Sequence, residues 1–178
     1  DNDVVVVDRN CHKSIEQGLM LTGAKPVYMV PSRNRYGIIG PIYPQEMQPE
    51  TLQKKISESP LTKDKAGQKP SYCVVTNCTY DGVCYNAKEA QDLLEKTSDR
   101  LHFDEAWYGY ARFNPIYADH YAMRGEPGDH NGPTVFATHS THKLLNALSQ
   151  ASYIHVREGR GAVNFSRFNQ AYMMHATT

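Results

Sequence analysis

Asp3-Val4-Val5-Val6-Val7-Asp8, close to the start of the chain, is a run of β-branched residues flanked by acids. A continuous apolar run of this length is typical of a strand that is buried on both faces, as in a parallel sheet. A predicted helix over residues 11–22 follows and ends at Gly23, and a second strand is predicted over residues 25–30. This order of strand, helix and strand favours an α/β fold with a mainly parallel sheet flanked by helices.

The same alternation continues along the chain. Pro49 suits the first turn of a helix over residues 49–59, and Asn86 with Glu89 suits the start of a helix over residues 87–96. Further strands are predicted over residues 72–76, 101–104, 134–137 and 150–156, the last of which could run antiparallel. Residues 33–48, 60–70 and 125–133 are predicted to be connections, and residues 115–124 helical or irregular. We therefore expect residues 1–178 to form a single domain without a repeat.

Composition limits the class of protein. The chain has 178 residues, of which 40% are hydrophobic and 21% charged, which is ordinary for a globular domain. Its 19 basic residues balance its 19 acidic ones, so no overall field favours binding to nucleic acid or to an anionic membrane. No apolar run is long enough to span a bilayer, and the first residues do not resemble a signal peptide. We expect a cytoplasmic protein, and the missing initiator methionine indicates an internal piece of a longer one.

The cysteines and histidines do not predict a metal site. Cys11, Cys73, Cys78 and Cys84 lack the paired spacing of zinc ligands and are expected to be reduced and mostly buried. Two of the 8 histidines, at positions 139 and 142, lie in a predicted turn without a carboxylate at a helical spacing. The arginines at positions 33, 35, 157 and 160 are expected to be solvated or to lie at an interface, and not to form a patch that binds nucleic acid.

A polar segment, Thr138-His139-Ser140-Thr141-His142-Lys143, follows the predicted strand over residues 134–137. Hydroxyl, imidazole and amine groups at the exit of a strand suit a site for a phosphate and a carbonyl group. Lys143 is thus a candidate for a lysine that forms a Schiff base with pyridoxal phosphate, and Ser140 and His142 are candidate donors to phosphate oxygens. A solvated loop lysine and ordinary turn contacts are the alternative interpretations.

Two further residues lie at predicted strand exits. Asp104 ends a short apolar strand in the run Leu101-His102-Phe103-Asp104-Glu105-Ala106-Trp107, and His12 follows the first strand. Ligands of open α/β sheets collect at the carboxyl ends of the strands. A carboxylate at Asp104 could pair with the pyridine nitrogen of an electron-accepting cofactor, and the His12 ring could stack on it. A loop-capping aspartate and a solvent-facing histidine at a helix start remain the alternatives.

Together these segments carry a family resemblance. The segments at residues 8–14, 104–107 and 140–143 resemble, in order and spacing, the bacterial ornithine/lysine/arginine decarboxylases of the aspartate-aminotransferase fold. The resemblance covers essentially the whole chain and implies pyridoxal phosphate as cofactor. It implies that Lys143 forms the Schiff base, that Asp104 pairs with the pyridinium and that His12 stacks on the ring. It also implies roles for three more residues: phosphate contacts for Ser140 and His142, and packing beside the cofactor for Trp107.

Within this family the chain looks most like the members that convert L-arginine to agmatine and carbon dioxide in acid resistance. Lysine or ornithine decarboxylation and transamination remain alternatives, because the residues that select the substrate are expected mostly outside the chain. The resemblance implies a homodimer that assembles into a larger homo-oligomer. It also implies a phosphate-binding Ser/Thr loop that the chain does not contain, so we expect residues 1–178 to be part of the cofactor-binding domain and an isolated fragment to be inactive.

Overall fold

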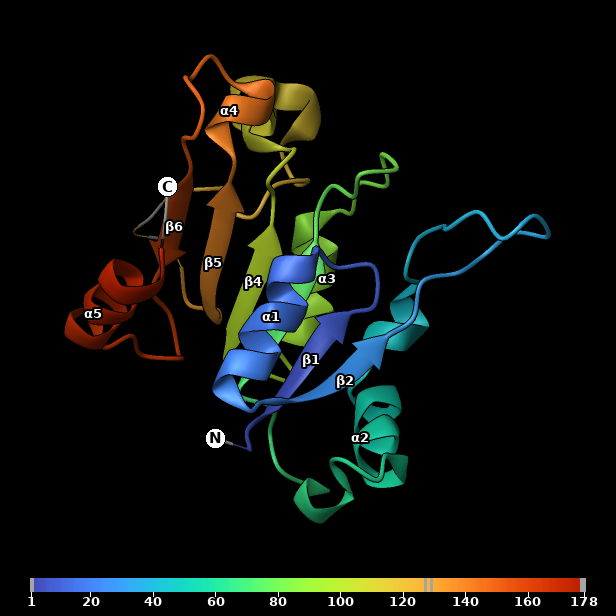
Figure 1. Cartoon of the computed structure of the whole chain (residues 1–178). Helices are drawn as coiled ribbons and strands as arrows, with labels where there is room; N and C mark the ends of the chain where they lie inside the picture. The colour runs from blue at the N-terminus through green and yellow to red at the C-terminus, as the bar shows by residue number, and fades with distance from the viewer. Residues whose placement is uncertain (1, 127, 129, 177–178) are drawn as a thin grey trace.

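The computed structural model describes residues 2–126, 128 and 130–176. In that part of the chain the strands form one sheet in the order β2-β1-β3-β4-β5-β6, in which β1 to β5 are parallel and β6 is antiparallel to β5 (Figure 1). The strands are β1 Val4–Asp8, β2 Lys25–Met29, β3 Tyr72–Thr76, β4 Arg100–Asp104, β5 Thr134–His139 and β6 Tyr153–Arg157. The predicted mainly parallel sheet and the antiparallel last strand are confirmed.

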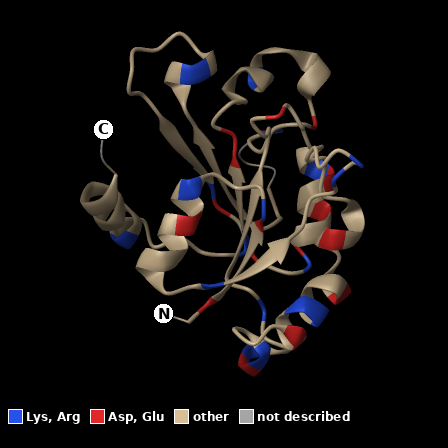
Figure 2. Ribbon diagram, turned by 45° about the vertical axis from the view of Figure 1, so that its right-hand side comes forward, with Lys and Arg blue, Asp and Glu red and all other residues tan. Residues whose placement is uncertain are grey.

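Helices lie on both faces of this sheet (Figure 1). They are α1 Lys13–Thr22, α2 Pro49–Glu58, α3 Ala87–Leu94, the single turn α4 Thr141–Leu144 and α5 Phe165–His175. Short 3-10 turns, η1 Pro44–Met47, η2 Lys63–Lys65, η3 Gly109–Phe113 and η4 Pro115–Tyr117, occupy the connections. In the ribbon of Figure 2 most of the lysine, arginine, aspartate and glutamate positions lie on the helices and loops.

The core has two layers because successive side chains of a strand point to opposite faces. On the face of α2 and α3, the larger cluster includes Val6, Val75 and Phe103 from the strands and Leu52 and Leu94 from the helices. On the face of α1, a smaller cluster joins Leu19 of the helix to strand residues Val5, Val7 and Val74. The run of four valines therefore supplies both cores, which explains why it lacks polar alternation.

Local signals set the helix boundaries. The side chain of His12 accepts a hydrogen bond from the Ser14 amide at the start of α1, and Gly23 ends the helix at φ +66°, where a side chain would be strained. Pro49 begins α2, and the Asn86 side chain accepts a hydrogen bond from the Glu89 amide in α3. These boundaries agree with the sequence analysis to within two residues.

Some features differ from the expectations. Thr138 and His139 of the polar segment extend β5, the residues Thr141–Leu144 form the one-turn helix α4, and α5 was not predicted. Cys73 and Cys78 are buried, whereas Cys11 is half-buried and Cys84 is exposed, so burial of the cysteines was overestimated. Pro127 and Asp129 of the predicted 125–133 connection lie outside the described residues.

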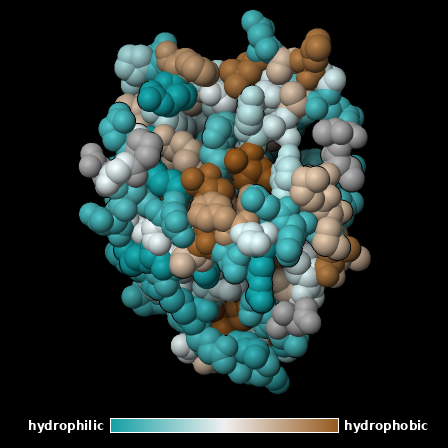
Figure 3. Space-filling view, turned by 90° about the vertical axis from the view of Figure 1, so that its left-hand side faces the viewer, coloured by the Kyte–Doolittle hydropathy of each residue, from teal (hydrophilic) through white to brown (hydrophobic). Residues whose placement is uncertain are grey.

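The outer surface near β6 is partly apolar. Large exposed side chains of β6 and α5 include Tyr153, Phe165, Met173 and Met174. Figure 3 shows apolar side chains gathered near the middle of the face that lies on the left in Figure 1, surrounded by hydrophilic ones. Among the described residues, no helix is both long and apolar enough to cross a membrane.

Candidate active site

An open cavity of about 760 Å³ lies at the carboxyl ends of the parallel strands. Because β1, β3, β4 and β5 are neighbours in the sheet, the segments that follow them meet there. Its walls include His12 after β1, Cys78 after β3, Asp104 and Trp107 at and after β4, and Ser140 and Lys143 after β5. Five of the six predicted site residues thus line one cavity. His12 comes together there with residues that follow it by 92 positions or more in the sequence.

Lys143 sits in α4 with its amine above an aromatic ring. Its Nζ lies 4.7 Å from the centre of the Trp107 ring, and its backbone amide donates to the Ser140 carbonyl oxygen over 3.0 Å. The neighbouring Tyr80 ring packs against the Trp107 ring in a T-shaped arrangement, with 5.8 Å between the ring centres. A cation over an indole face is attracted to it. The Lys143 amine is thus held at the cavity wall.

Asp104 is held by two hydrogen bonds at one carboxylate oxygen. Its Oδ1 accepts from the Ala106 amide at 3.2 Å and from the Thr138 hydroxyl at 3.3 Å. The Thr138 hydroxyl also lies 3.1 Å from Nε2 of His102. Burial lowers the pKa of His102, although Asp104 acts in the opposite direction. A neutral His102 ring that donates from Nε2 leaves the Thr138 hydroxyl free to donate to Asp104.

A second carboxyl group, Asp8, is buried beneath the cavity at the end of β1. Burial raises the pKa of Asp8, and the charge of Asp104 adds to this effect. The Asp8 carboxyl accepts hydrogen bonds from the amides of Asn10 at 2.7 Å and Thr76 at 3.3 Å. It ties the exits of β1 and β3 together and is not itself among the residues of the cavity wall.

The three other candidate cofactor contacts, His12, Ser140 and His142, differ in placement. His12 is exposed, begins α1 and lines the cavity, so it is a helix-start residue and a cavity residue at once. Ser140 also lines the cavity, and its side chain makes no capping hydrogen bond to α4. His142 lies elsewhere: its Nδ1 is 2.7 Å from the carbonyl oxygen of Ala151, in the segment before β6. The structure does not bring His142 to the cavity wall.

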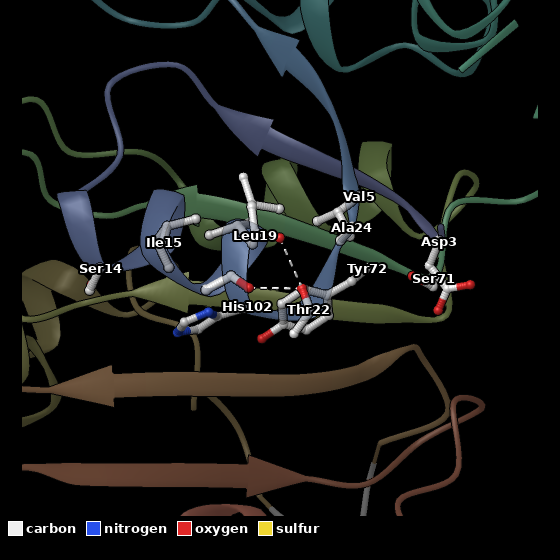
Figure 4. A pocket seen from close by; sticks show the side chains of 12 residues that line it. Asp3, Val5, Ser14, Ile15, Leu19, Thr22, Ala24, Ser71, Tyr72 and His102 are labelled. Atoms are coloured by element: carbon white, nitrogen blue, oxygen red, sulfur yellow. Dashed lines mark hydrogen bonds between the residues drawn. The ribbon is translucent and has the colours of Figure 1, made fainter. Parts of the chain in front are cut away.

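A neighbouring cavity of about 430 Å³ lies between α1 and strands β1, β3 and β4 (Figure 4). Its wall includes Leu19 and Tyr72 and shares Ser14, Ile15 and His102 with the larger cavity. None of the six predicted site residues lines it. The amine and carboxylate that a cofactor would need are therefore in the larger cavity.

The sequence analysis did not assign roles to Glu105, His139 or Thr138. Glu105 is fully buried, and its Oε2 accepts from Nε2 of His139 over 3.0 Å. Strand alternation offered a signal: where extended backbone continues one residue past Asp104, the two neighbouring acids point in opposite directions, and only one of them reaches the cavity. A buried carboxylate needs donors, and His139 supplies one.

Comparison with known proteins agrees with this geometry. Residues 1–178 match the family model described as Orn/Lys/Arg decarboxylase, major domain. The chain is 99% identical over 178 residues to the biodegradative arginine decarboxylase of Escherichia coli (strain K12), covering 100% of this chain and 24% of that protein. It is 50% identical over 177 residues to a lysine decarboxylase of Pseudomonas aeruginosa, covering 99% of this chain and 23% of that protein.

A solved structure shares the fold closely. The structure titled lysine decarboxylase A from Pseudomonas aeruginosa matches with a TM-score of 0.88 and 49% identity, covering 100% of this chain and 24% of that one. The chain thus spans about a quarter of the length of the curated relatives above. The resemblance carried by the three segments is confirmed by a family match along the whole chain: this chain belongs to the Orn/Lys/Arg decarboxylase family, whose major domain it matches.

Proposed function

We propose that this chain forms part of the cofactor-binding domain of a pyridoxal-phosphate-dependent decarboxylase that converts arginine to agmatine and carbon dioxide. The observation that carries the proposal is that Lys143 and Asp104 line the same cavity, one after β5 and one at the end of β4. The 99% identical relative is named an arginine decarboxylase, which supports arginine as the substrate.

The cavity wall fits the chemical groups of pyridoxal phosphate. The aldehyde requires an amine, which Lys143 provides, and the pyridine nitrogen requires a carboxylate, which Asp104 provides. Both described hydrogen bonds to Asp104 use Oδ1, so Oδ2 is available to the ring nitrogen. Ser140 offers a hydroxyl to the phosphate, and His12 and Trp107 offer flat faces at the cavity wall.

Each residue then has a defined task. When bound, pyridoxal phosphate supplies a carbonyl carbon that reacts with amines and a ring that accepts the electron pair left by a departing carboxylate. Lys143 would hold the cofactor through its amine, and Asp104 would keep a proton on the pyridine nitrogen. His12 would lie against the ring and Ser140 would donate to the phosphate. The predicted phosphate contact of His142 would require its ring to leave Ala151.

Lysine is the second candidate substrate, because a lysine decarboxylase is 50% identical to this chain. Among the described residues of the cavity wall, Asp104 is the only acid, and its proposed partner is the cofactor. A second acid for a guanidinium or an ammonium group would therefore have to come from outside this cavity wall. Arginine is preferred on overall identity, 99% against 50%.

The remaining expectations belong to the longer protein. Four expectations stay predictions. They are the assignment of residues 1–178 as a partial cofactor domain, the homodimer that assembles further, the cytoplasmic location and the role in acid resistance. An isolated fragment is predicted to be inactive, since the chain spans only about a quarter of the length of its curated relatives.

The test uses the full-length protein supplied with pyridoxal phosphate and, separately, with arginine, lysine and ornithine. Mass spectrometry should detect agmatine from arginine, with carbon dioxide in equal amount. Lys143→Ala should abolish the product, whereas Lys63→Ala, a change at an exposed lysine in η2, should not. Formation of a keto acid would contradict the proposal. So would faster decarboxylation of lysine than of arginine.

A further inference from the structure

Glu105 is a fully buried carboxylate that the proposed chemistry does not use. It directly follows Asp104, the last residue of β4, and its amide donates to the Thr138 carbonyl oxygen over 3.0 Å; Asp104 lines the cavity, whereas Glu105 does not. A buried carboxylate is costly unless donors satisfy it, so its partners indicate what it does for the fold.

Three donors from three segments meet at Glu105. Oε1 accepts from the side-chain amide of Asn77 at 3.0 Å and from the backbone amide of Ala122 at 2.7 Å. Oε2 accepts from Nε2 of His139 at 3.0 Å. Asn77 itself extends the network, since its Oδ1 accepts from the Tyr85 amide at 2.9 Å. One carboxylate thus joins the exits of β3, β4 and β5 to the segment around Ala122.

The bond to His139 joins the two segments that carry the candidate site. His139 is the residue before Ser140 and lies four positions before Lys143, whereas Glu105 lies between Asp104 and Trp107. The His139 side chain is 15% exposed, and its ring packs against that of His155 in β6 with 4.7 Å between centres. The His139 ring is therefore held between Glu105, which follows β4, and His155 of β6. A change at the Glu105–His139 bond would shift the β5 exit relative to the β4 exit.

We propose that Glu105 and His139 are positioning residues for the cofactor site: their buried hydrogen bond sets the β4 and β5 exits so that Asp104 and Lys143 reach one cofactor together. The inference rests on the proposed function, in which Asp104 and Lys143 hold pyridoxal phosphate. His139 also lines the cavity, whereas Glu105 does not, so the role proposed for the pair depends on their hydrogen bond and not on contact of Glu105 with the cofactor. The pair acts through the segments on which the two site residues are carried.

Two amide substitutions at His139 in the full-length protein separate the bond from the bulk of the side chain. The Gln amide of His139→Gln reaches about as far as the imidazole Nε2 and can still donate to Glu105, whereas the shorter amide of His139→Asn cannot reach it. Thr97→Val is the matched control for a buried polar group, because the Thr97 hydroxyl is buried without a hydrogen-bond partner among the described residues. The dissociation constant of pyridoxal phosphate is measured by titrating cofactor-free protein and following the cofactor's absorption.

His139→Asn should raise this dissociation constant about ten- to a hundredfold, the range for losing a hydrogen bond to a buried charged group. His139→Gln and Thr97→Val should stay within about threefold of the wild type. Borohydride reduction should trap less cofactor on Lys143 in His139→Asn at equal cofactor concentration. Melting of the cofactor-free proteins checks that each variant folds; if His139→Asn does not fold, His139→Leu, which also lacks a donor to Glu105, takes its place in the comparison with His139→Gln.

Three results would overturn the inference. They are wild-type affinity in His139→Asn, equal impairment of the Asn and Gln variants, and a rise of tenfold or more in His139→Gln. In each case borohydride would still trap the cofactor on Lys143 of the wild type, and the proposed function would stand. Failure to trap any cofactor on Lys143 of the wild type would instead overturn the proposed function and this inference with it.

Discussion

Replacing Thr138 with valine should slow decarboxylation by the full-length protein about five- to tenfold. Valine keeps the shape of threonine but removes the hydroxyl that lies 3.3 Å from Asp104 and 3.1 Å from His102. A hydrogen bond to a charged partner stabilises by roughly 1.5–3 kcal/mol, but 3.3 Å is long for a hydroxyl donor, so about 1 kcal/mol applies here. Each 1.36 kcal/mol corresponds to a tenfold change in rate.

The assay is kcat with saturating pyridoxal phosphate and arginine, measured for the wild type, Thr138→Val and Thr138→Ser. Serine retains the hydroxyl, so Thr138→Ser should stay within about twofold of the wild type. Equal rates in the valine and serine variants would refute the idea that the Thr138 hydroxyl orients Asp104. So would a wild-type rate in Thr138→Val.

Two predictions concern stability. The stability contribution of Asp8, whose pKa is raised by burial, is fully present below its ordinary pKa of 3.8 and is lost as pH rises through the raised folded-state pKa. Hydrogen exchange of the full-length protein measures the protection of β1 amides in Asp8→Asn and in the wild type. The protection in Asp8→Asn relative to the wild type should therefore increase as pH rises, and a constant difference between the two proteins would contradict this. Phe103→Ala deletes a fully buried ring and should cost roughly 3–5 kcal/mol, which a lower urea midpoint of the full-length protein would report and an unchanged midpoint would refute.

Much of the fold follows from local patterns in this sequence. Three local signals each predict one structure, and the structure agrees with all three. They are the four valines of β1, Gly23 after α1 and Asn86 before α3. α5 was missed because none of its residues is buried, so no apolar face of the helix is set by the core. The polar segment at Ser140 gave no helical periodicity over a single turn.

The candidate site could be predicted only in part. Asp104 ends a strand and His12 and Lys143 follow strands, and parallel strands bring their exits to one edge, so a shared cavity could be expected. The partners of these residues could not be expected, because they depend on register. Pairing of Asp104 with Thr138 in neighbouring strands places the Thr138 hydroxyl on the carboxylate, and the same register lets His139 reach Glu105.

Identification of the amine that binds pyridoxal phosphate tests the central claim most directly. The cavity wall holds two lysines among its described residues, Lys143 after β5 and Lys13 at the start of α1. The full-length protein is incubated with pyridoxal phosphate, reduced with borohydride, digested and examined by mass spectrometry. The account predicts that the pyridoxyl group is on Lys143 and disappears in Lys143→Ala. A group found on Lys13 instead, or retained in Lys143→Ala, would contradict it.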